Sequence, residues 1–299
     1  MRVVVGSRGS KLALAQTNWV ISKLKSKNPN VDFELKIIKT KGDKIQHISL
    51  DKIGGKGLFV KEIEQQLLDG DIDMAVHSMK DMPAQVPEGL KFSHIPKREE
   101  YRDVIVLKEG YTCLKDLPKG AKIGTGSKRR KYQILRYRPD LNVVSIRGNI
   151  DTRIKKIKEQ DLDGVILAAA GINRLNIQET IKNKIYYLST DIVLPAPAQG
   201  ALAIEVRENN KEIEAMLKDI QHKETEIQIK AERAFLEAID GSCHIPVGAL
   251  CSVKDESIKL DALFGTEDGQ ALVRKSLSGK AKDARKIGFE LAEIISKEL

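Results

Sequence analysis

The sequence predicts an α/β protein with two related lobes and a small α+β domain toward its C-terminal end. Three observations support this prediction. A strand, a Gly-Ser/Thr turn with arginine, a helix, a proline and a second strand follow one another twice, at residues 3–38 and 121–146. The end of a helix, an acidic turn and a buried strand then recur at residues 67–76 and 159–168. After about residue 220 the pattern changes to a helix, three strands and a final helix.

The first repeat begins with an apolar run at residues 3–5, which is typical of a buried strand. A turn at residues 6–10 leads into a helix whose apolar stripe spans residues 12–24, with Ser10 as the expected N-cap. Backbone N–H groups at the start of a helix, with Arg8 beside them, are typical of an anion site. Many such turns hold no ligand, so this turn alone does not establish a site.

Residues 41–57 combine four glycines with four lysines and show weak periodicity. We interpret them either as a mobile basic lid over a site or as a plain solvent loop. An amphipathic helix over residues 58–68 follows, and it leads into a strand at residues 74–76.

Lys80 and Asp81 stand between this strand and Pro83, which ends any helix and biases Met82 toward an extended conformation. In open α/β sheets, ligands bind beyond the carboxyl ends of the strands. The adjacent cation and carboxylate are therefore placed where a site is expected. A solvated loop is the alternative, and this stretch alone supports both interpretations equally.

The second repeat predicts strands at residues 104–107, 121–124 and 143–146, with helical spacing between strands. That spacing favours parallel pairing with right-handed crossovers in both lobes. Residues 193–200 carry two prolines and predict a hinge, and the strand after it, at 201–206, could return to the first lobe. Two lobes joined in this way make a cleft, which is the usual place for a ligand.

The C-terminal part is predicted to be a small α+β domain. It has expected helices at 227–239 and 284–295 and expected strands at 247–253, 258–264 and 271–277, the last two joined around Asp268-Gly269, a hairpin signal. The predicted boundaries are residues 1–97 for the first lobe, completed by about 197–218, residues 101–192 for the second lobe and residues 220–299 for the C-terminal domain.

The composition describes an ordinary soluble globular protein, with 41% hydrophobic and 31% charged residues. The 299 residues carry 51 Lys and Arg against 42 Asp and Glu, a net charge of +9 that indicates an anionic partner. We expect no nucleic acid partner, because aromatic residues make up only 4% and no recognition-helix or zinc-finger pattern is present. We expect no membrane association, because no apolar run could span a bilayer and no signal peptide begins the chain.

The three cysteines leave one over in any disulfide scheme, which favours a reducing, cytoplasmic location. The five histidines lack metal-ligand spacing with cysteine or acidic residues, so we predict no metal site. Cys113 and Cys251 are expected to be inert. Cys243 lies in a glycine-flanked loop after a helix, where a thiol could serve as a nucleophile or as a covalent tether.

Arginines gather after the predicted strands of the second lobe, and one more follows the first strand of the first lobe. Arginine suits bidentate capture of carboxylates better than lysine does. A single arginine is usually a surface ion pair, but six at the carboxyl ends of strands favour an anion site in the cleft. The six are Arg8, Arg129, Arg130, Arg147, Arg153 and Arg174.

Together these segments resemble the porphobilinogen deaminase family, also called the hydroxymethylbilane synthases. The resemblance covers nearly the whole chain and lies in residues 6–14, 54–59, 76–83, 124–130, 147–149, 194–201 and 232–248. Ala198 and Ala203 stand where the family commonly has glycine, and Ser242 replaces a common glycine beside Cys243. These differences bear on the stiffness of the hinge and on the detail of the loop.

The resemblance implies an α/β fold of two periplasmic-binding-protein-like lobes around a cleft, with a small α+β C-terminal domain. It implies a transferase that joins four porphobilinogen molecules head to tail, with loss of ammonia each time, into the linear tetrapyrrole hydroxymethylbilane. The product grows on one dipyrromethane cofactor per chain, held by a thioether to Cys243. Asp81 matches the catalytic carboxylate, which bonds pyrrole N–H groups, stabilises the cation left when ammonia departs and assists proton transfer.

The other site residues are also carried over from the family. Besides Cys243, the cofactor contacts are Lys80, Asp81, Ser127, Arg129 and Arg130. The substrate contacts are Arg8, Ser10, Gln16, Lys56, Arg147, Arg153, Arg174 and Gln199. Phe59 and Lys61 fall on the lid and the helix after it. Because every added pyrrole brings two more carboxylates, a growing chain needs a cationic site.

The alternative function is a non-catalytic, two-lobed anion-binding module. It shares the hinge and the arginines, but it gives no use for Asp81 beside a loop cysteine. A basic RNA-binding protein is a third interpretation, and it would need salt-sensitive affinity in the absence of pyrroles. No observation requires more than a monomer.

Overall fold

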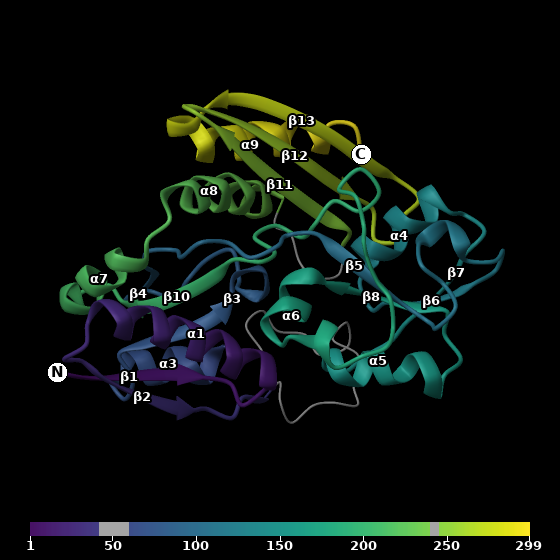
Figure 1. Cartoon of the computed structure of the whole chain (residues 1–299). Coiled ribbons are helices and arrows are strands. Elements are labelled where there is room, and N and C mark those ends of the chain that lie inside the picture. The colour runs from purple at the N-terminus through teal and green to yellow at the C-terminus, as the bar shows by residue number, and fades with distance from the viewer. Residues whose placement is uncertain (42–59, 240–244) are drawn as a thin grey trace. The chain divides into compact units, whose positions relative to one another are not determined.

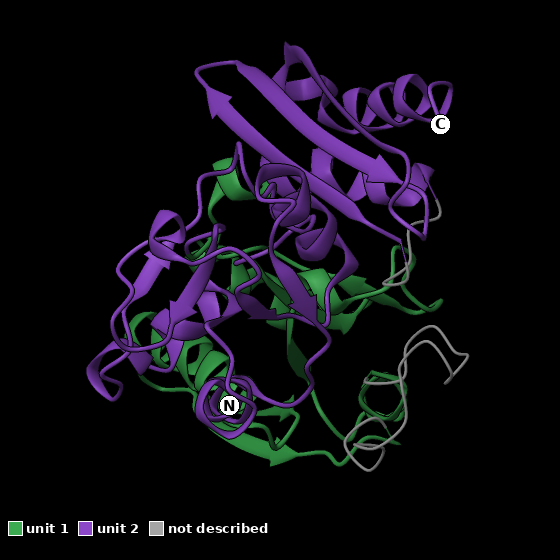
Figure 2. Cartoon of the chain, turned by 90° about the vertical axis from the view of Figure 1, so that its right-hand side faces the viewer, with its two compact units in different colours: residues 1–99, 201–226 green, residues 100–200, 227–299 purple. Residues whose placement is uncertain are grey.

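The computed structural model describes residues 1–41, 60–239 and 245–299. Within these ranges the chain forms two compact units, residues 1–99 with 201–226 and residues 100–200 with 227–299 (Figure 2). The chain therefore passes from one unit to the other at three points, after residues 99, 200 and 226.

The first unit is built on a five-stranded sheet in the order β2-β1-β3-β10-β4 (Figure 1). Its strands are β1 (Arg2–Ser7), β2 (Asp32–Ile37), β3 (Met74–Ser78), β4 (Leu90–Phe92) and β10 (Leu202–Arg207). Strand β1 pairs in parallel with β2 and β3, whereas β10 pairs antiparallel with β3 and β4. The segment after residue 200 thus returns to the first sheet.

Helices cover both faces of this sheet. Helices α1 (Lys11–Lys27) and α7 (Lys211–Leu217) pack on one face, where they meet Met74 and Val76, and α3 (Lys61–Leu68) packs on the other face against Ala75. Strand β3 is therefore buried on both sides, which explains why its sequence is a continuous apolar run rather than an alternating one.

The second unit contains a sheet with the same pattern of strand directions, in the order β7-β6-β8-β5-β9. Its strands are β5 (Asp103–Leu107), β6 (Lys122–Gly124), β7 (Asn142–Val144), β8 (Gly164–Ala168) and β9 (Ile185–Tyr187). Strand β6 is parallel to β7 and β8, and β5 is antiparallel to β8 and β9. Helix α4 (Lys128–Tyr137) packs on one face, and α5 (Ile150–Glu159) and α6 (Ala169–Arg174) pack on the other.

The expectation of parallel pairing throughout both lobes is wrong for β5 and β10. Both strands run antiparallel to the strand at the centre of their sheet. Each follows a segment that arrives from the other unit instead of a helix of its own sheet. Only a parallel neighbour needs a crossover connection, so the helical spacing in the sequence carries no information on the direction of these two strands.

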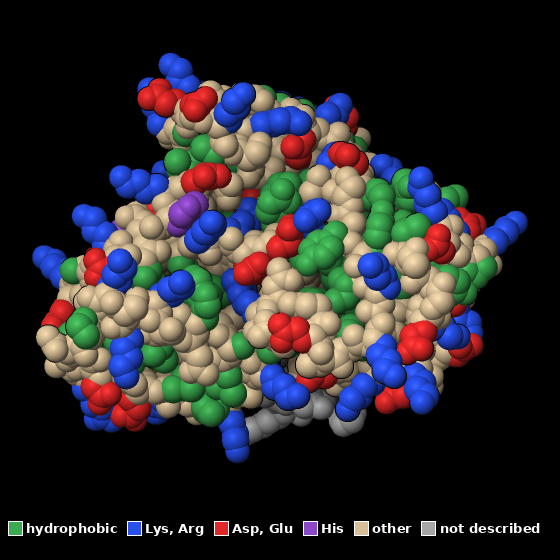
Figure 3. Space-filling model, in the orientation of Figure 1, with side chains coloured by type: hydrophobic (Ala, Val, Ile, Leu, Met, Phe, Trp, Pro, Cys, Tyr) green, Lys and Arg blue, Asp and Glu red, His purple; other side chains and the backbone are tan. Residues whose placement is uncertain are grey.

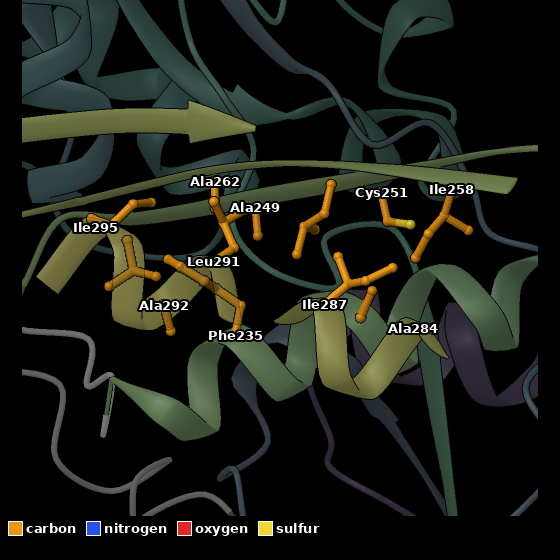
Figure 4. Close-up of a cluster of buried hydrophobic side chains, with 13 residues drawn as sticks. Phe235, Ala249, Cys251, Ile258, Ala262, Ala284, Ile287, Leu291, Ala292 and Ile295 are labelled. Atoms are coloured by element: carbon orange, nitrogen blue, oxygen red, sulfur yellow. The ribbon is translucent and has the colours of Figure 1, made fainter. Parts of the chain in front are cut away.

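The C-terminal part of the second unit is an antiparallel sheet of β11 (Val247–Lys254), β12 (Ser257–Gly265) and β13 (Leu272–Lys280). Helices α8 (Lys223–Ala238) and α9 (Ala284–Ser296) contribute Phe235 and Leu291 to one apolar cluster with this sheet (Figure 4). The side chain of Cys251 lies in the same cluster and is 1% exposed. The predicted hairpin between β12 and β13 turns through Gly269, whose φ of +76° suits glycine.

The predicted fold class, two related α/β lobes and a small α+β part, is confirmed. Short 3₁₀ helices complete the described chain at η2 (Met79–Asp81), η3 (Leu114–Asp116), η4 (Ile177–Glu179), η5 (Lys218–Ile220) and η6 (Ala281–Asp283). Basic and acidic side chains are interspersed on the face shown in Figure 3. In the part of the chain that the structure describes, every helix is too short or too polar to cross a bilayer.

Candidate active site

The carboxyl end of β3 carries η2, the 3₁₀ turn that contains Lys80 and Asp81. The turn ends at Met82, which is extended (φ −82°, ψ 139°) because Pro83 follows it. Met79 and Met82 are 1% and 3% exposed and anchor the turn, whereas Lys80 is half-buried and Asp81 is exposed. Within the described ranges no hydrogen bond or ion pair engages the Asp81 carboxylate. Both of its oxygens are therefore available to a ligand.

The turn after β1 lies at the same edge of the sheet, because β1 and β3 run in parallel. Ser10 caps α1 as predicted, since its Oγ accepts a hydrogen bond from the Ala13 N–H at 3.2 Å. Gln16 is 3% exposed, and its Nε2 donates to Ser78 Oγ at 2.8 Å. Its side chain thus joins α1 to the end of β3. Arg8 is half-buried in the same turn.

A buried histidine–carboxylate contact links β3 to β10. His77 Nε2 and Glu205 Oε2 lie 3.1 Å apart, and the two side chains are 5% and 0% exposed. Burial, and then the charge of Glu205, raises the pKa of Glu64 on α3. This contact was not predicted from the sequence. A lone acidic residue inside the apolar strand 201–206 was the signal that could have found it.

In the second unit, the turn after β6 begins α4. Ser127 is the N-cap, with its Oγ accepting from the Arg130 N–H at 3.4 Å, and Thr125 Oγ1 accepts from the Ser127 N–H at 3.2 Å. A Cβ on Gly126 would lie 2.8 Å from Ile146 O, so only glycine allows this close approach. The turn therefore brings Ser127 and the first residues of α4 to the carboxyl end of β6.

Arg129 and Arg130 do not extend into solvent but share one buried carboxylate, Asp103 at the start of β5. The three residues are 5%, 6% and 0% exposed. Arg129 Nη1 donates to Asp103 Oδ2 at 2.6 Å. Arg130 donates to Asp103 Oδ1 through Nε at 3.0 Å and through Nη2 at 2.8 Å. We call Asp103, Arg129 and Arg130 the arginine cluster.

The arginine cluster holds two positive charges and one negative charge, so it is positive overall. Burial alone would raise the pKa of Asp103, but the charges of Arg129 and Arg130 outweigh burial and hold that pKa well below its usual range. Asp103 is therefore ionised at neutral pH. Because an unbalanced buried charge is costly, the cluster favours an anionic ligand.

Gln199 extends this network. It is 0% exposed, and its Nε2 donates to Asp103 Oδ1 at 3.0 Å and to Tyr101 O at 2.8 Å. The Gln199 amide nitrogen is thus hydrogen-bonded to the carboxylate of the arginine cluster. Asp103 was not predicted as a site residue, although a charged residue at the start of the apolar run 103–107 was a usable signal.

The remaining arginines of the second lobe lie at the neighbouring strand ends. Arg147 follows β7 and Arg153 lies in the first turn of α5. Arg153 Nε donates to Gly148 O, in the turn between these two elements, at 2.7 Å. Gly148 has a φ of +115°, and a Cβ there would lie 2.7 Å from the Thr152 side chain, so the turn requires glycine. Arg174 ends α6, and its Nη2 donates to Gly200 O at 2.8 Å.

Several predicted site residues lie outside the described residues. They are Cys243, Lys56, Phe59 and all of the predicted lid except Lys41. Lys61 is described and is exposed at the start of α3. Among the described residues, no group of three or more His, Cys, Asp and Glu side chains is arranged to hold a metal ion.

Comparison with known proteins gives the family. One family model, described as porphobilinogen deaminase, dipyromethane cofactor binding domain, matches residues 3–215, and a second, porphobilinogen deaminase, C-terminal domain, matches residues 226–297. The chain belongs to the porphobilinogen deaminase family. The porphobilinogen deaminase of Clostridium novyi (strain NT) is 62% identical over 299 residues, which is 100% of both chains. That of Clostridioides difficile (strain 630) is 58% identical over 298 residues, which is 100% of this chain and 98% of the relative.

Among solved structures, a probable amino-acid ABC transporter extracellular-binding protein from Bacillus subtilis aligns with a TM-score of 0.42 and 13% identity. The alignment covers 74% of this chain and 90% of that structure.

Membership of the porphobilinogen deaminase family confirms the resemblance found in the sequence. It also confirms the dipyrromethane cofactor, which is named in the description of the model for residues 3–215. That model spans η2 and the arginine cluster, whereas Cys243 falls within the C-terminal model.

Proposed function

We propose that the chain is a transferase of tetrapyrrole biosynthesis that joins four porphobilinogen molecules into hydroxymethylbilane. One ammonia leaves at each addition, and one water is consumed when the finished chain is hydrolysed from the primer and gains its hydroxyl group. The match of the two family models to residues 3–215 and 226–297 is the observation that carries this proposal. The geometry supports it, because each unit presents charged side chains at the carboxyl edge of its sheet, where ligands of α/β proteins bind.

Asp81 is the proposed catalytic carboxylate. It is exposed, and no described residue occupies its oxygens. A carboxylate in this state can accept the N–H of a pyrrole ring and stabilise the positive charge that develops on that ring as ammonia leaves. It can also take up and return a proton during the addition. Lys80, the neighbouring cation, is proposed to bind a carboxylate of the cofactor.

The arginine cluster is proposed to hold carboxylates of the dipyrromethane cofactor, together with Ser127. The donor set fits this group, because Arg129 is 5% exposed while its Nε and Nη2 have no hydrogen-bond partner within the described residues. These two N–H donors are not fully buried, so an anion can reach them and accept two parallel charge-assisted hydrogen bonds. When bound, the dipyrromethane supplies the primer that is extended.

The remaining contacts are proposed to bind the carboxylates of porphobilinogen and of the growing product. Arg8, Ser10 and Gln16 lie at the carboxyl edge of the first sheet, and Arg147, Arg153 and Arg174 lie at that of the second. Gln199 also belongs to this set, and its Nε2 donates to Asp103 of the arginine cluster. Lys56 of the predicted lid completes the proposed set, which comprises Arg8, Ser10, Gln16, Lys56, Arg147, Arg153, Arg174 and Gln199.

Cys243 is proposed to carry the cofactor through a thioether. The test is a denaturing intact mass of the purified protein before and after incubation with porphobilinogen. We expect the parent chain to exceed its sequence mass by one dipyrromethane adduct and Cys243→Ser to show no adduct. Cys113→Ser is the matched control, because Cys113 is half-buried with its Sγ bonded to Asp116 Oδ1 at 3.3 Å. A parent that gains no adduct overturns the proposal and favours a non-catalytic anion-binding module.

We also propose that the enzyme acts in the cytoplasm as a monomer. The unpaired cysteines Cys113 and Cys251 support a reducing location. Light scattering behind a sizing column tests the oligomeric state, and a mass of two chains would overturn that part of the proposal.

A further inference from the structure

We infer that Asp103 is a positioning residue that holds Arg129 so that one edge of its guanidinium stays open to a carboxylate. This inference rests on the proposed function. It adds to that function a residue which touches no proposed ligand and acts through two residues that do. Four observations on the second unit carry it.

The first observation is the use of the donors of Arg129. Its Nη1 donates to Asp103 Oδ2 at 2.6 Å and to Leu194 O at 2.7 Å, which engages both hydrogens of that nitrogen. Its Nε and Nη2 have no partner within the described residues. These two nitrogens form an edge of the guanidinium that binds a carboxylate with two parallel hydrogen bonds. Asp103 thus fixes one corner of Arg129 and leaves this edge open.

The second observation is the different use of Arg130. Its Nε and Nη2 both donate to Asp103 Oδ1, at 3.0 Å and 2.8 Å, and its Nη1 donates to Ile166 O at 3.2 Å. The edge that is open in Arg129 is therefore filled by Asp103 in Arg130. Each oxygen of Asp103 thus accepts hydrogen bonds from a different arginine, Oδ2 from Arg129 and Oδ1 from Arg130.

The third observation is the charge. Asp103 is 0% exposed and leaves the arginine cluster with one excess positive charge, which matches one carboxylate of a ligand. Without Asp103, two buried guanidiniums would face each other unbalanced and would separate or draw in a second anion. Asp103 therefore determines both the orientation of the Arg129 guanidinium and the net charge of the arginine cluster.

The fourth observation ties the arginine cluster to the segment that precedes β10. Gln199 Nε2 donates to Asp103 Oδ1 at 3.0 Å, and Leu194 O accepts from Arg129 Nη1 at 2.7 Å and from Gln133 Nε2 at 3.1 Å. Both ends of this segment thus contact the residues that set the open edge. The segment therefore contacts Arg129 directly at Leu194 and contacts Asp103, which holds Arg129, at Gln199.

The test compares cofactor loading with folding. Parent, Asp103→Glu, Arg129→Lys and the double variant are produced in cells that cannot make porphobilinogen, so that they start unmodified. Each is incubated with porphobilinogen, the rate of adduct formation is followed by denaturing intact mass, and Tm is measured in parallel. Asp103→Glu keeps the charge but moves the carboxylate by one methylene. We expect it to melt close to the parent and to load at least tenfold more slowly.

Asp140→Asn is the control for the loss of an aspartate–arginine pair in the same unit. Asp140 accepts from Arg138 Nε and Nη2, at 2.7 Å each, and neither residue belongs to the arginine cluster. This variant is expected to load at the parent's rate whatever its Tm. If Asp103 acts through Arg129, the double variant loads no more slowly than Arg129→Lys alone.

If Asp103→Glu does not melt cooperatively, Gln199→Met is used in its place. It keeps all three charges, removes the Nε2 donor to Asp103, and is expected to load several-fold more slowly with a Tm near the parent's. Loading of the folded Asp103 variant at the parent's rate, or multiplicative slowing in the double variant, overturns the inference alone. A parent chain that takes up no adduct overturns the proposed function, and this inference with it.

Discussion

Glu232 Oε2 accepts a hydrogen bond from the backbone N–H of Ala198 at 2.6 Å. The other oxygen, Oε1, accepts from the Cys251 N–H at 2.9 Å. Glu232 is 0% exposed, so a single buried carboxylate on α8 serves both the segment before β10 and strand β11. These two contacts join the predicted hinge to the part of the chain that precedes and follows Cys243.

Replacing Glu232 by alanine is expected to lower the free energy of unfolding by about 3 kcal/mol. Two buried N–H groups lose their acceptor, and each such loss costs about 1–3 kcal/mol. Urea unfolding followed by circular dichroism measures the change. Glu237→Gln is the control on the same helix, because Glu237 is paired with Arg285 near the surface and such pairs contribute little. A loss no larger than that of the control would contradict the prediction.

Ala198→Gly is expected to stabilise the protein by about 0.5–1 kcal/mol. Ala198 has a φ of +61°, in the left-handed region, which costs a residue with a Cβ about 1–2 kcal/mol. Glycine removes this strain, but the greater freedom of the unfolded chain returns about 0.4–1 kcal/mol of the gain. The midpoint of urea unfolding should therefore rise.

Ala203→Gly is the matched control, because the resemblance to the family predicts glycine at both positions. Ala203 lies inside β10 and is 0% exposed, so glycine there is expected to destabilise the protein by about 1 kcal/mol. The sequence shows the same residue at both positions, whereas the backbone conformation differs: only Ala198 has a positive φ. Equal shifts in the unfolding midpoint of the two variants would show that the strain at Ala198 is absent in solution.

The features that the sequence predicted well depend on neighbours along the chain. Ser10 caps α1 through a residue three positions away, and the β12–β13 hairpin turns at Asp268-Gly269. Strands β4 and β9 were not predicted, although β7, which is equally short and also lies at a sheet edge, was predicted. Short-range patterns are thus sufficient for caps, hairpins and long helices.

The features that the sequence did not predict depend on distant residues. Asp103 lies 26 and 27 positions from Arg129 and Arg130 and 96 positions from Gln199, so no local pattern connects them. The arginines themselves were expected at strand ends. Which of their N–H groups are bonded and which stay open depends on Asp103, and only the fold brings Asp103 beside them. The site residues carried over from the family remain predictions.

Asp81→Asn is expected to lower kcat by about 10²–10⁴-fold while Tm stays unchanged. The amide keeps the shape of the side chain but cannot carry the charge or the proton that the proposed reaction needs. Folding is unaffected because no described residue depends on the Asp81 carboxylate. Product formation from porphobilinogen measures the effect. Asp71→Asn is the control, since Asp71 is also exposed and its Oδ2 lies 3.3 Å from Lys36 Nζ. Near-normal turnover of Asp81→Asn would remove Asp81 from the catalytic role.

Asp103 is expected to determine part of the loss of stability in acid. Its folded-state pKa lies well below the usual value, so the unfolded chain binds the proton at a higher pH than the folded chain does. The stabilisation from Asp103 is therefore complete above the unfolded-state pKa of about 4, and below it the stabilisation falls by about 1.4 kcal/mol per pH unit. It continues to fall until the pH passes the folded-state pKa.

Asp103→Asn removes this contribution and leaves two buried guanidiniums unbalanced, which is expected to cost about 3–5 kcal/mol at neutral pH. Urea unfolding of parent and variant at about pH 7, 5, 4 and 3 separates the effect from that of the other carboxylates, because these are common to both chains. The difference in unfolding free energy should be constant from neutral pH to about pH 5 and should shrink below about pH 4. A difference that stays constant down to pH 3 would mean that Asp103 has an ordinary pKa in the folded protein, and its pairing with Arg129 and Arg130 would then be too weak to hold their guanidiniums in place.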